Sequence, residues 1–366
     1  MRILILNFRD LANAAAGGAE VFTEEISKRL VQYGNDVTIF SSAFDGCEED
    51  SYRTGIRIVR KGGKYSVYRN ARKFLKEHFS EFDLVVDEIN TIPFQAYKVA
   101  KGKPLVALIH QLAREIWYHE TWFPLNVVGY HVLESFWLRH YREIPTITVS
   151  ESTRSDLLQL GFKDVHIIRN GIGAEPLREL PVKPDHPILI FVGRMVSSKQ
   201  PDHALKAYLM IKERFPDAKL WVIGDGYLRP RLEKQCADGV RFFGHVSGEE
   251  KFELLRQAHI MLSPSVREGW GVSVIEANSM ATPAIGYAVP GLKDSIIDGT
   301  TGCLVQPNNP SGLAKAACQV LDDADLRRKL SIGALDWSRH FNWDNSAAEF
   351  NSLTQSISNR GSRPEG

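Results

Sequence analysis

The sequence predicts an α/β protein with two doubly wound domains, and three observations support this prediction. Short apolar stretches alternate with stretches whose apolar residues recur at helical spacing, which is typical of parallel sheets joined by crossover helices. Four prolines between Glu175 and Pro187 separate two series of this kind. The length of 366 residues also fits two domains, at roughly 100–200 residues per domain.

The first series begins with the apolar stretch Met1–Phe8, which we expect to be a buried strand. A loop rich in alanine and glycine leads into an expected helix, Glu20–Tyr33, which Gly34 terminates. Val37–Ser41 is the second strand, so the unit is a strand, a helix and a parallel strand. Further strands are predicted at Ile56–Val59, Asp83–Asp87, Leu105–Ile109, Thr146–Val149 and Val165–Ile168, and a helix at Val67–Phe79.

The proline-rich stretch 176–187 is a predicted linker, because proline holds itself and the residue before it in extended conformations. It separates an N-terminal domain, 1–175, from a C-terminal domain, 188–339. Open α/β sheets bind ligands outside the carboxyl ends of their strands, so we expect the two domains to face each other across a cleft. The strands predicted for the C-terminal domain are Ile188–Gly193, Lys219–Gly224, Val240–Gly244, His259–Pro264 and Ala284–Ala288.

The chain then continues with an amphipathic segment, Trp337–Ile357, and a tail, 358–366, that we expect to be flexible. Charged residues make up 24% and hydrophobic residues 43% of the chain, as in soluble globular proteins. A net charge of +1 gives no support for nucleic-acid binding. Four widely spaced cysteines and no long apolar run predict a cytoplasmic protein with free thiols and no transmembrane helix.

The strongest chemical motif is a glycine-punctuated loop followed by a short helix, expected at Ser273–Met280. Glu268 lies in the loop and Glu276 on the helix, eight residues apart. The backbone N–H groups at the start of a helix bind anions, and carboxylates are good acceptors for sugar hydroxyls. Gly269 and Gly271 let the backbone approach a ligand closely. This combination suits a sugar nucleotide.

Two further loops carry candidate ligand-binding residues. Arg194 and Lys199 follow the first strand of the second series and could neutralise a diphosphate, although two solvated surface charges would look the same. Gly17 and Gly18 lie between the first strand and its helix, where a glycine pair lets the backbone meet a phosphate or a sugar. This loop lacks the G-x-G-x-x-G fingerprint, which disfavours a dinucleotide-binding dehydrogenase.

Together these motifs resemble those of the retaining GT-B glycosyltransferases of family 4, the glycosyl transferases group 1, over most of the chain. Glu268 and Glu276 resemble the E-x7-E motif of this family, with Trp270 where phenylalanine is common. Arg194 and Lys199 match its diphosphate clamp. Gly244–Val246, Asn170–Ile172, Pro290–Leu292 and Asp298–Gly302 resemble further family segments, with Leu292 in place of a usual glycine.

The resemblance implies two Rossmann-like domains and a role for each motif. Glu276 would accept hydrogen bonds from the ribose, and Val246 would lie at the nucleobase. Glu268 and the backbone N–H groups of Trp270, Gly271 and Val272 would hold the sugar and phosphates, beside Gly269. Arg194 and Lys199 would stabilise the departing diphosphate. In the N-terminal domain Gly17, Gly18 and His110 would meet the donor sugar. The final helix, about 340–357, would pack back on the N-terminal domain.

The implied reaction moves a hexose or related sugar from a nucleotide diphosphate sugar to an acceptor, with retention of anomeric configuration. A UDP-sugar is favoured and a GDP-sugar comes next. No Asp-x-Asp metal motif stands in a suitable context, so no cofactor or divalent metal is expected. Alternatives are a nucleotide-sugar-binding protein without turnover, and a sugar-nucleotide epimerase or a phosphorylase on the same fold.

The acceptor would be a saccharide, a lipid-linked saccharide or a small molecule, bound mainly by the N-terminal domain. Residues 53–76 contain nine basic and no acidic side chains, which predicts peripheral contact with the anionic inner face of a membrane. The segment Ile116–Tyr141 is dense in aromatic residues. Such residues are more often core, but some could line an acceptor cleft or reach a membrane interface.

Overall fold

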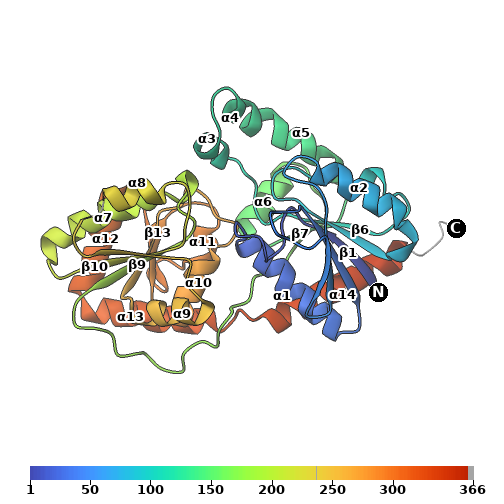
Figure 1. The fold of residues 1–366 in the computed structure, drawn as a ribbon. Coiled ribbons are helices and arrows are strands. Elements are labelled where there is room, and N and C mark those ends of the chain that lie inside the picture. Colours follow the sequence, from blue (N-terminus) through green and yellow to red (C-terminus); the bar gives the residue numbers. More distant parts are fainter. Residues whose placement is uncertain (236, 362–366) are drawn as a thin grey trace. The chain divides into compact units, whose positions relative to one another are not determined.

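The computed structural model describes residues 1–235 and 237–361, and the contacts within this part of the chain divide it into two units (Figure 1). Unit 1 comprises Met1–Arg114, Val128–Gly171 and the chain from Asn342 onward. Unit 2 comprises Glu115–Val127 and Ile172–Phe341. The segment Glu115–Val127 thus groups with unit 2, whereas the sequence places all of 1–175 in the N-terminal domain. The predicted free thiol of Cys236 lies outside the described residues.

Unit 1 is built on an eight-stranded sheet in the order β3-β4-β2-β1-β5-β6-β7-β8. All neighbouring strands are parallel except β3 and β4, which form a hairpin through Thr54 and Gly55, both at positive φ. The sequence missed β3 because it is a short, polar edge strand. The strands are β1 Arg2–Leu6, β2 Asp36–Ser41, β3 Asp50–Arg53, β4 Ile56–Arg60, β5 Leu84–Glu88, β6 Leu105–Leu108, β7 Thr146–Thr148 and β8 Val165–Ile167.

The helices of unit 1 connect these strands and cover the sheet. Helix α1 ends at Gln32, and Gly34 follows it with φ +80°, as a helix-terminating glycine should. Short 3-10 turns lie at Phe79–Glu81, Ala96–Lys98 and Arg139–Tyr141, and a π-helical turn at Gly129–Leu133. The α-helices are α1 Gly18–Gln32, α2 Val67–Glu77, α5 Glu134–Leu138, α6 Glu151–Gln159 and α14 Trp343–Gly361, with α4 Leu125–Val128 at the boundary of the units.

The last helix of the chain differs from the sequence-based expectation at both ends. Trp337 belongs to α13, Ala324–Ser338, so the expected segment Trp337–Ile357 spans a break between two helices. Helix α14 continues to Gly361, so residues 358–361 are helical rather than part of a flexible tail, and 362–366 lie outside the described residues. This helix packs against α1 in unit 1. The Oδ1 of its Asn351 accepts a hydrogen bond from the Nδ2 of Asn35 at 3.2 Å.

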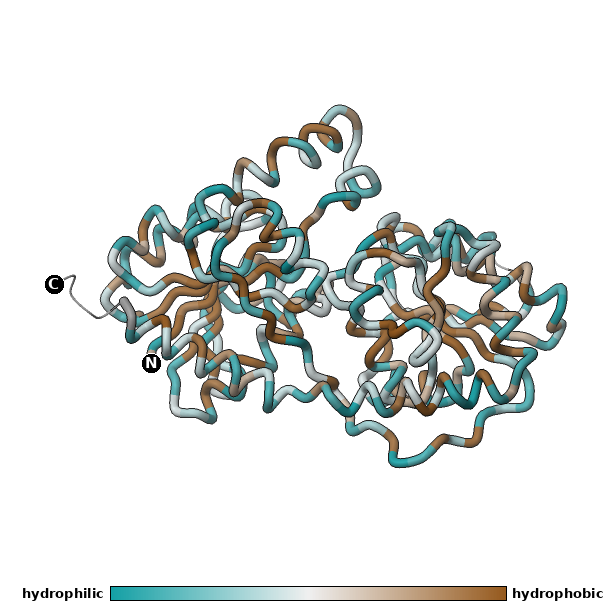
Figure 2. Tube along the Cα trace, turned by 180° about the vertical axis from the view of Figure 1, so that it is seen from behind, coloured by the Kyte–Doolittle hydropathy of each residue, from teal (hydrophilic) through white to brown (hydrophobic). Residues whose placement is uncertain are grey.

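Unit 2 is built on a six-stranded parallel sheet in the order β11-β10-β9-β12-β13-β14. The sequence predicted every strand except β14. Its strands, like those of unit 1, are mostly hydrophobic, as the brown segments of Figure 2 show. The strands are β9 Ile188–Val192, β10 Lys219–Ile223, β11 Val240–Gly244, β12 Ile260–Ser263, β13 Ala284–Tyr287 and β14 Gly302–Val305.

Helices pack on this sheet and close its core. One short helix, α3, comes from the segment that precedes the linker in sequence. A 3-10 turn at Ser197–Lys199 follows β9. The helices are α3 Ile116–Glu120, α7 Pro201–Arg214, α8 Arg229–Lys234, α9 Gly248–Gln257, α10 Val272–Ser279, α11 Leu292–Ser295, α12 Pro310–Asp322 and α13.

The predicted linker, 176–187, contains no helix or strand. Several hydrogen bonds fasten it to unit 2. The N–H of Leu177 donates to the carbonyl of Ser279 at 2.9 Å, and the Nζ of Lys183 donates to the carbonyl of Ala258 and to Oγ1 of Thr282. Burial lowers the pKa of Lys183 to about 7. The linker is therefore a packed part of unit 2.

Candidate active site

The predicted donor-site residues of unit 2 lie where the strand order of its sheet reverses. Strands β9 and β12 are neighbours, and the chain leaves them toward opposite edges of the sheet. The loop after β9 carries Arg194 and Lys199, and the loop after β12 carries Glu268. The carboxyl ends of strands at such a reversal are the usual ligand sites of open α/β sheets.

Glu268 is held by one side chain from each of these two loops. Its Oε1 accepts from the Nζ of Lys199 at 2.5 Å and from the Oγ of Ser265 at 2.7 Å. Both charged side chains stay partly exposed, 21% for Lys199 and 15% for Glu268. The side chain of Arg194 is exposed, and its guanidinium has no ion pair or hydrogen bond with another described residue. The structure thus pairs Lys199 with Glu268 and leaves the guanidinium of Arg194 accessible to a ligand.

The loops around Glu268 interlock through their backbones. The N–H of Val266 donates to the carbonyl of Ser198, and the N–H of Glu268 donates to the carbonyl of Pro290. Gly291 follows with φ +81°, and a Cβ there would lie 2.2 Å from the carbonyl oxygen of Glu268. Only glycine fits this position, so the stretch that starts at Pro290 positions Glu268.

Helix α10 begins directly after Gly271, which has φ +83°. The N–H groups of Gly271 and Val272 find no acceptor among residues 1–235 and 237–361, as expected at the start of a helix. Gly269 is partly buried in the same loop. The side chain of Trp270 is 3% exposed and packs edge-on against Phe341. The Trp270 ring is therefore part of the core, and its backbone belongs to the loop.

Glu276, on α10, is paired with a lysine that the sequence analysis missed. Its Oε1 accepts from the Nζ of Lys251 on α9 at 2.5 Å, and the two side chains are 12% and 24% exposed. Val246 precedes α9 and packs partly against the core of unit 2. Nothing in the local sequence of α9 marks Lys251, because its partner lies 25 residues later in the chain.

The segment Glu115–Val127 joins the loops of unit 2 through two carboxylates that match no motif in the sequence. Glu115 forms an ion pair at 2.6 Å with the buried Arg267, which precedes Glu268 in the sequence. Glu120 accepts from the N–H of Ser198 at 2.8 Å and from the hydroxyl of Tyr227 at 3.1 Å. The segment thus contacts the loop that carries Lys199.

The glycine pair of unit 1 lies at the corresponding reversal of its sheet, between β1 and β5. Gly17 caps α1 and donates its N–H to Oε2 of Glu20 at 2.7 Å, and Gly18 is the first helical residue. The φ of Gly17 is −145°, and a Cβ there would meet only the Glu20 carboxylate, at 3.7 Å. Packing within unit 1 therefore gives no reason for glycine at position 17.

His110 follows β6, and its side chain is 11% exposed. Its Nε2 lies 3.2 Å from Oε1 of Glu88, the last residue of β5, which is fully buried. The other oxygen of Glu88 accepts from the hydroxyl of Thr23 on α1 at 2.5 Å. Burial raises the pKa of Glu88, and the hydrogen bond with His110 opposes that rise. The sequence analysis ended this strand at Asp87 and so missed Glu88, although two adjacent acidic residues at the end of a buried strand are unusual.

The basic run 53–76 is less uniform in the structure than in the sequence. Five of its nine cationic side chains are paired with carboxylates outside the run, including the buried Arg60 with Asp10.

In the aromatic segment Ile116–Tyr141, Trp117 and Tyr141 are buried, as core residues are. Trp122 and Phe123, in contrast, are 71% and 74% exposed. The expected split between core and surface aromatics is therefore present.

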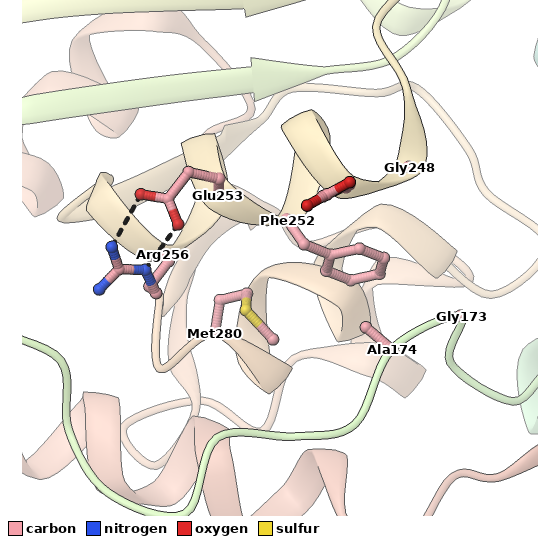
Figure 3. Close-up of a pocket in the computed structure, with 8 residues that line it drawn as sticks. Gly173, Ala174, Gly248, Phe252, Glu253, Arg256 and Met280 are labelled. Carbon is pink, nitrogen blue, oxygen red and sulfur yellow. Dashed lines mark hydrogen bonds and ion pairs between the residues drawn. The ribbon is translucent and has the colours of Figure 1, made fainter.

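A separate hollow of about 530 Å³ lies on unit 2 beside α9 (Figure 3). Phe252 and Met280 form apolar parts of its wall, and Glu253 and Arg256 neutralise each other through two hydrogen bonds of 2.8 Å. None of the predicted site residues lines it. The lining residues are Gly173, Ala174, Gly248, Glu249, Phe252, Glu253, Arg256 and Met280. Because none of the motif residues contributes to this hollow, we place the candidate site at the motif loops instead.

Within the described residues, no cluster of three or more His, Cys, Asp or Glu side chains is arranged to hold a metal ion. None of the described helices is both long enough and apolar enough to span a bilayer.

Comparisons with known proteins identify the family of this chain. The family model for glycosyltransferase family 4 matches residues 16–175, and the model for glycosyl transferases group 1 matches residues 175–337. An uncharacterized glycosyltransferase of Methanocaldococcus jannaschii is 31% identical, over 91% of this chain and 93% of its own length. The chain therefore belongs to the family 4 glycosyltransferases of group 1.

Solved structures share the fold. A sucrose-phosphate synthase from Thermosynechococcus elongatus superimposes with a TM-score of 0.78, at 18% identity, over 97% of this chain and 98% of its own. HepE of Anabaena, solved in complex with UDP-glucose, superimposes with a TM-score of 0.72, at 16% identity, over 96% of this chain and 100% of its own. These comparisons confirm the predicted family and the predicted GT-B fold class of two Rossmann-like domains.

Proposed function

We propose that this glycosyltransferase moves a hexose or related sugar, with retention, from a nucleotide diphosphate sugar to a saccharide, lipid-linked or small-molecule acceptor. A UDP-sugar is the favoured donor and a GDP-sugar the next. The observation that carries the proposal is the loop that joins β12 to α10. Together with α10, this loop combines two carboxylates, Glu268 and Glu276, with the N–H groups of Gly271 and Val272, which have no acceptor within the described residues. The UDP-glucose complex of HepE supports the choice of UDP.

In this proposal Glu276 binds the ribose hydroxyls, and the backbone at Val246 meets the nucleobase. Glu268 and the backbone N–H groups of Trp270, Gly271 and Val272 hold the sugar and the phosphates. Arg194 and Lys199 stabilise the negative charge that develops on the departing diphosphate. The partial exposure of both lysine–carboxylate pairs supports these roles, because such pairs are weak enough for a ligand to rearrange.

Unit 1 supplies the remaining residues of the proposed reaction. Gly17 and Gly18 let the backbone approach the donor, and for Gly17 this is a role where packing within unit 1 does not require glycine. His110 contacts the donor sugar. The bond from the anomeric carbon to the diphosphate oxygen breaks, the acceptor oxygen bonds to the same face, and its proton leaves with the diphosphate. Contact of residues 53–76 with an anionic membrane stays a prediction.

We also propose that the reaction needs no divalent metal, because Arg194 and Lys199 can take over the neutralisation of the diphosphate. Turnover should therefore be unchanged in EDTA. Loss of turnover in EDTA that magnesium restores would contradict this proposal. The comparison is made on the wild-type chain with the donor that binds best in the following experiment.

The first experiment is a calorimetric titration of the wild-type chain with UDP, GDP, ADP and NAD. We expect binding of UDP, and a loss of roughly 10- to 100-fold in affinity for Glu276→Ala, because a hydrogen bond to a charged group contributes about 1.5–3 kcal/mol. Glu213→Ala, which removes an exposed carboxylate on α7 of the same unit, is the matched control and should bind UDP normally.

The outcomes separate the alternatives. Binding of UDP together with release of UDP from a UDP-sugar supports the transferase. Binding without turnover of any sugar conjugate favours a nucleotide-sugar-binding protein. Interconversion of the bound sugar without its release favours an epimerase, and binding of NAD alone would favour a dehydrogenase. Equal UDP affinities of Glu276→Ala and Glu213→Ala would contradict the assignment of the ribose site.

A further inference from the structure

We infer that Glu88 is a positioning residue that fixes the imidazole ring of His110 for sugar transfer. The inference rests on the proposed function, because it assumes that His110 meets the donor sugar. Three elements of unit 1 converge at this place. Glu88 ends β5, His110 follows the neighbouring strand β6, and Thr23 projects from α1. Both β5 and α1 adjoin the reversal of strand order at β1.

Each carboxylate oxygen of Glu88 has its own side-chain partner. Its side chain is fully buried, its Oε1 lies 3.2 Å from Nε2 of His110, and its Oε2 accepts from the hydroxyl of Thr23 at 2.5 Å. A buried carboxylate is costly unless it is paired and hydrogen-bonded. An apolar residue would fill this core position with less penalty, so the carboxylate is explained by its hold on the ring.

The rest of His110 is held as well. The ring packs edge-to-face with Phe22 at 5.2 Å between centroids. The carbonyl of His110 accepts from the hydroxyl of Thr153 on α6 at 3.3 Å. The ring nitrogen Nδ1 has no hydrogen-bond partner within the described part of the chain. With Nε2 engaged by Glu88, Nδ1 is the ring atom that remains for a sugar hydroxyl.

The adjacent Asp87 provides an internal contrast. It is equally buried, but it accepts from the N–H groups of Phe94 and Ala96 and from the hydroxyl of Tyr141. Since the neighbours along a strand point to opposite faces, Asp87 organises the loop after β5 and does not reach His110. Asp87 and Glu88 are thus two buried carboxylates with different partners, and Asp87→Asn is a control for general damage to the fold.

The experiment compares Glu88→Met with Glu88→Gln. Methionine keeps the volume but accepts no comparable hydrogen bond, whereas glutamine keeps an acceptor for the ring and lacks the charge. Donor turnover is measured as release of UDP from UDP-glucose. We expect Glu88→Met to lower kcat about 10- to 100-fold, as loss of a residue behind a functional histidine does, with UDP affinity unchanged. Glu88→Gln should restore most of kcat.

Two further readouts separate positioning from a structural role. In a His110→Ala background, Glu88→Met should change kcat less than about twofold, because the residue acts through the ring. Independently of activity, nitrogen NMR of histidine-labelled protein should show the Nε2–H form of His110 in the wild type and in Glu88→Gln. Glu88→Met should lose that preference, and Asp87→Asn should keep it. Thr23→Val replaces Glu88→Met if the latter does not fold.

Equal losses of kcat in both backgrounds, failure of glutamine to restore kcat, or an unchanged ring form in Glu88→Met would each overturn the inference. A wild-type chain that binds UDP but releases no UDP from UDP-glucose or other sugar conjugates would instead count against the proposed function. In that case the NMR comparison still decides whether Glu88 holds His110.

Discussion

Single residues of the candidate site are held by contacts that a ligand can replace. Glu268 and Glu276 each have one lysine partner, Lys199 and Lys251, and all four side chains keep partial exposure. Partly exposed ion pairs of this kind contribute about 0–1 kcal/mol to stability. Their value is therefore in keeping the two carboxylates ordered, one in a loop and one on a helix.

The residue-scale prediction concerns Gly291. Gly291→Ala should lower the free energy of unfolding by about 3 kcal/mol. The alanine would be strained at a φ of +81°, and its Cβ would lie 2.2 Å from the carbonyl oxygen of Glu268. It should also weaken UDP binding. Gly299→Ala is the matched control, since Gly299 has φ +70° but nothing within 4 Å of an added Cβ. It should cost about 1 kcal/mol. Equal losses in urea denaturation would contradict the packing argument.

At the scale of elements, the start of strand β12 is held by a buried histidine. Nδ1 of His259 accepts from the N–H of Ile188, the first residue of β9, at 3.1 Å. This side-chain hydrogen bond adds to the backbone pairing of β12 with β9. Burial, with the positive charges of Lys183 and Arg327 adding to it, lowers the pKa of His259 to about 4. The strand pair whose following loops carry Lys199 and Glu268 therefore depends on a neutral imidazole.

This arrangement predicts how stability depends on pH. Between the ordinary pKa of 6.5 and the folded value of about 4, only the unfolded chain protonates His259. Protons therefore favour unfolding, and stability should fall by up to about 3 kcal/mol as the pH drops through this window. In His259→Asn, whose Oδ1 can replace Nδ1 as acceptor, this part of the fall should be absent. Parallel pH profiles of the two proteins in urea denaturation would argue against it.

At the scale of the whole molecule, the last helix of the chain belongs to the first unit. The buried face of α14 packs within unit 1, and the Arg29 side chain of α1 pairs with Asp344 at 2.5 Å. The described chain thus passes from unit 1 into unit 2 and returns twice, at Val128 and at Asn342. The buried residues of α14 are Trp343, Ser346, Ala347, Phe350, Thr354 and Ile357.

Phe350→Ala should therefore destabilise unit 1 and leave the proposed nucleotide site of unit 2 intact. Phe350 is 1% exposed, and truncation of a buried phenylalanine costs about 3–5 kcal/mol. Glu349→Ala, on the exposed side of the same helix, should change stability by less than about 0.5 kcal/mol. Calorimetric unfolding with and without UDP tests both statements. Loss of UDP affinity in Phe350→Ala at a temperature where unit 2 is folded would contradict them.

Sequence reasoning located most elements because they follow local rules. Buried parallel strands are short apolar runs, and Gly34 ends α1 where a helix-terminating glycine is expected. It missed β3 and β14, which are edge strands with few or no fully buried residues. It also joined α13 to α14, because an apolar pattern across Trp337 and Phe341 does not show where the backbone turns.

What the sequence by itself determined is the class of fold and the loops that carry Arg194, Lys199, Glu268 and Glu276, since glycine positions and apolar periodicity are local properties. What only the tertiary structure decided is which groups meet. Lys199 and Glu268 are 69 residues apart, and His110 and Glu88 are 22 apart. Such pairs depend on which strands become neighbours in the sheet, and that order is set by the packing of the whole unit.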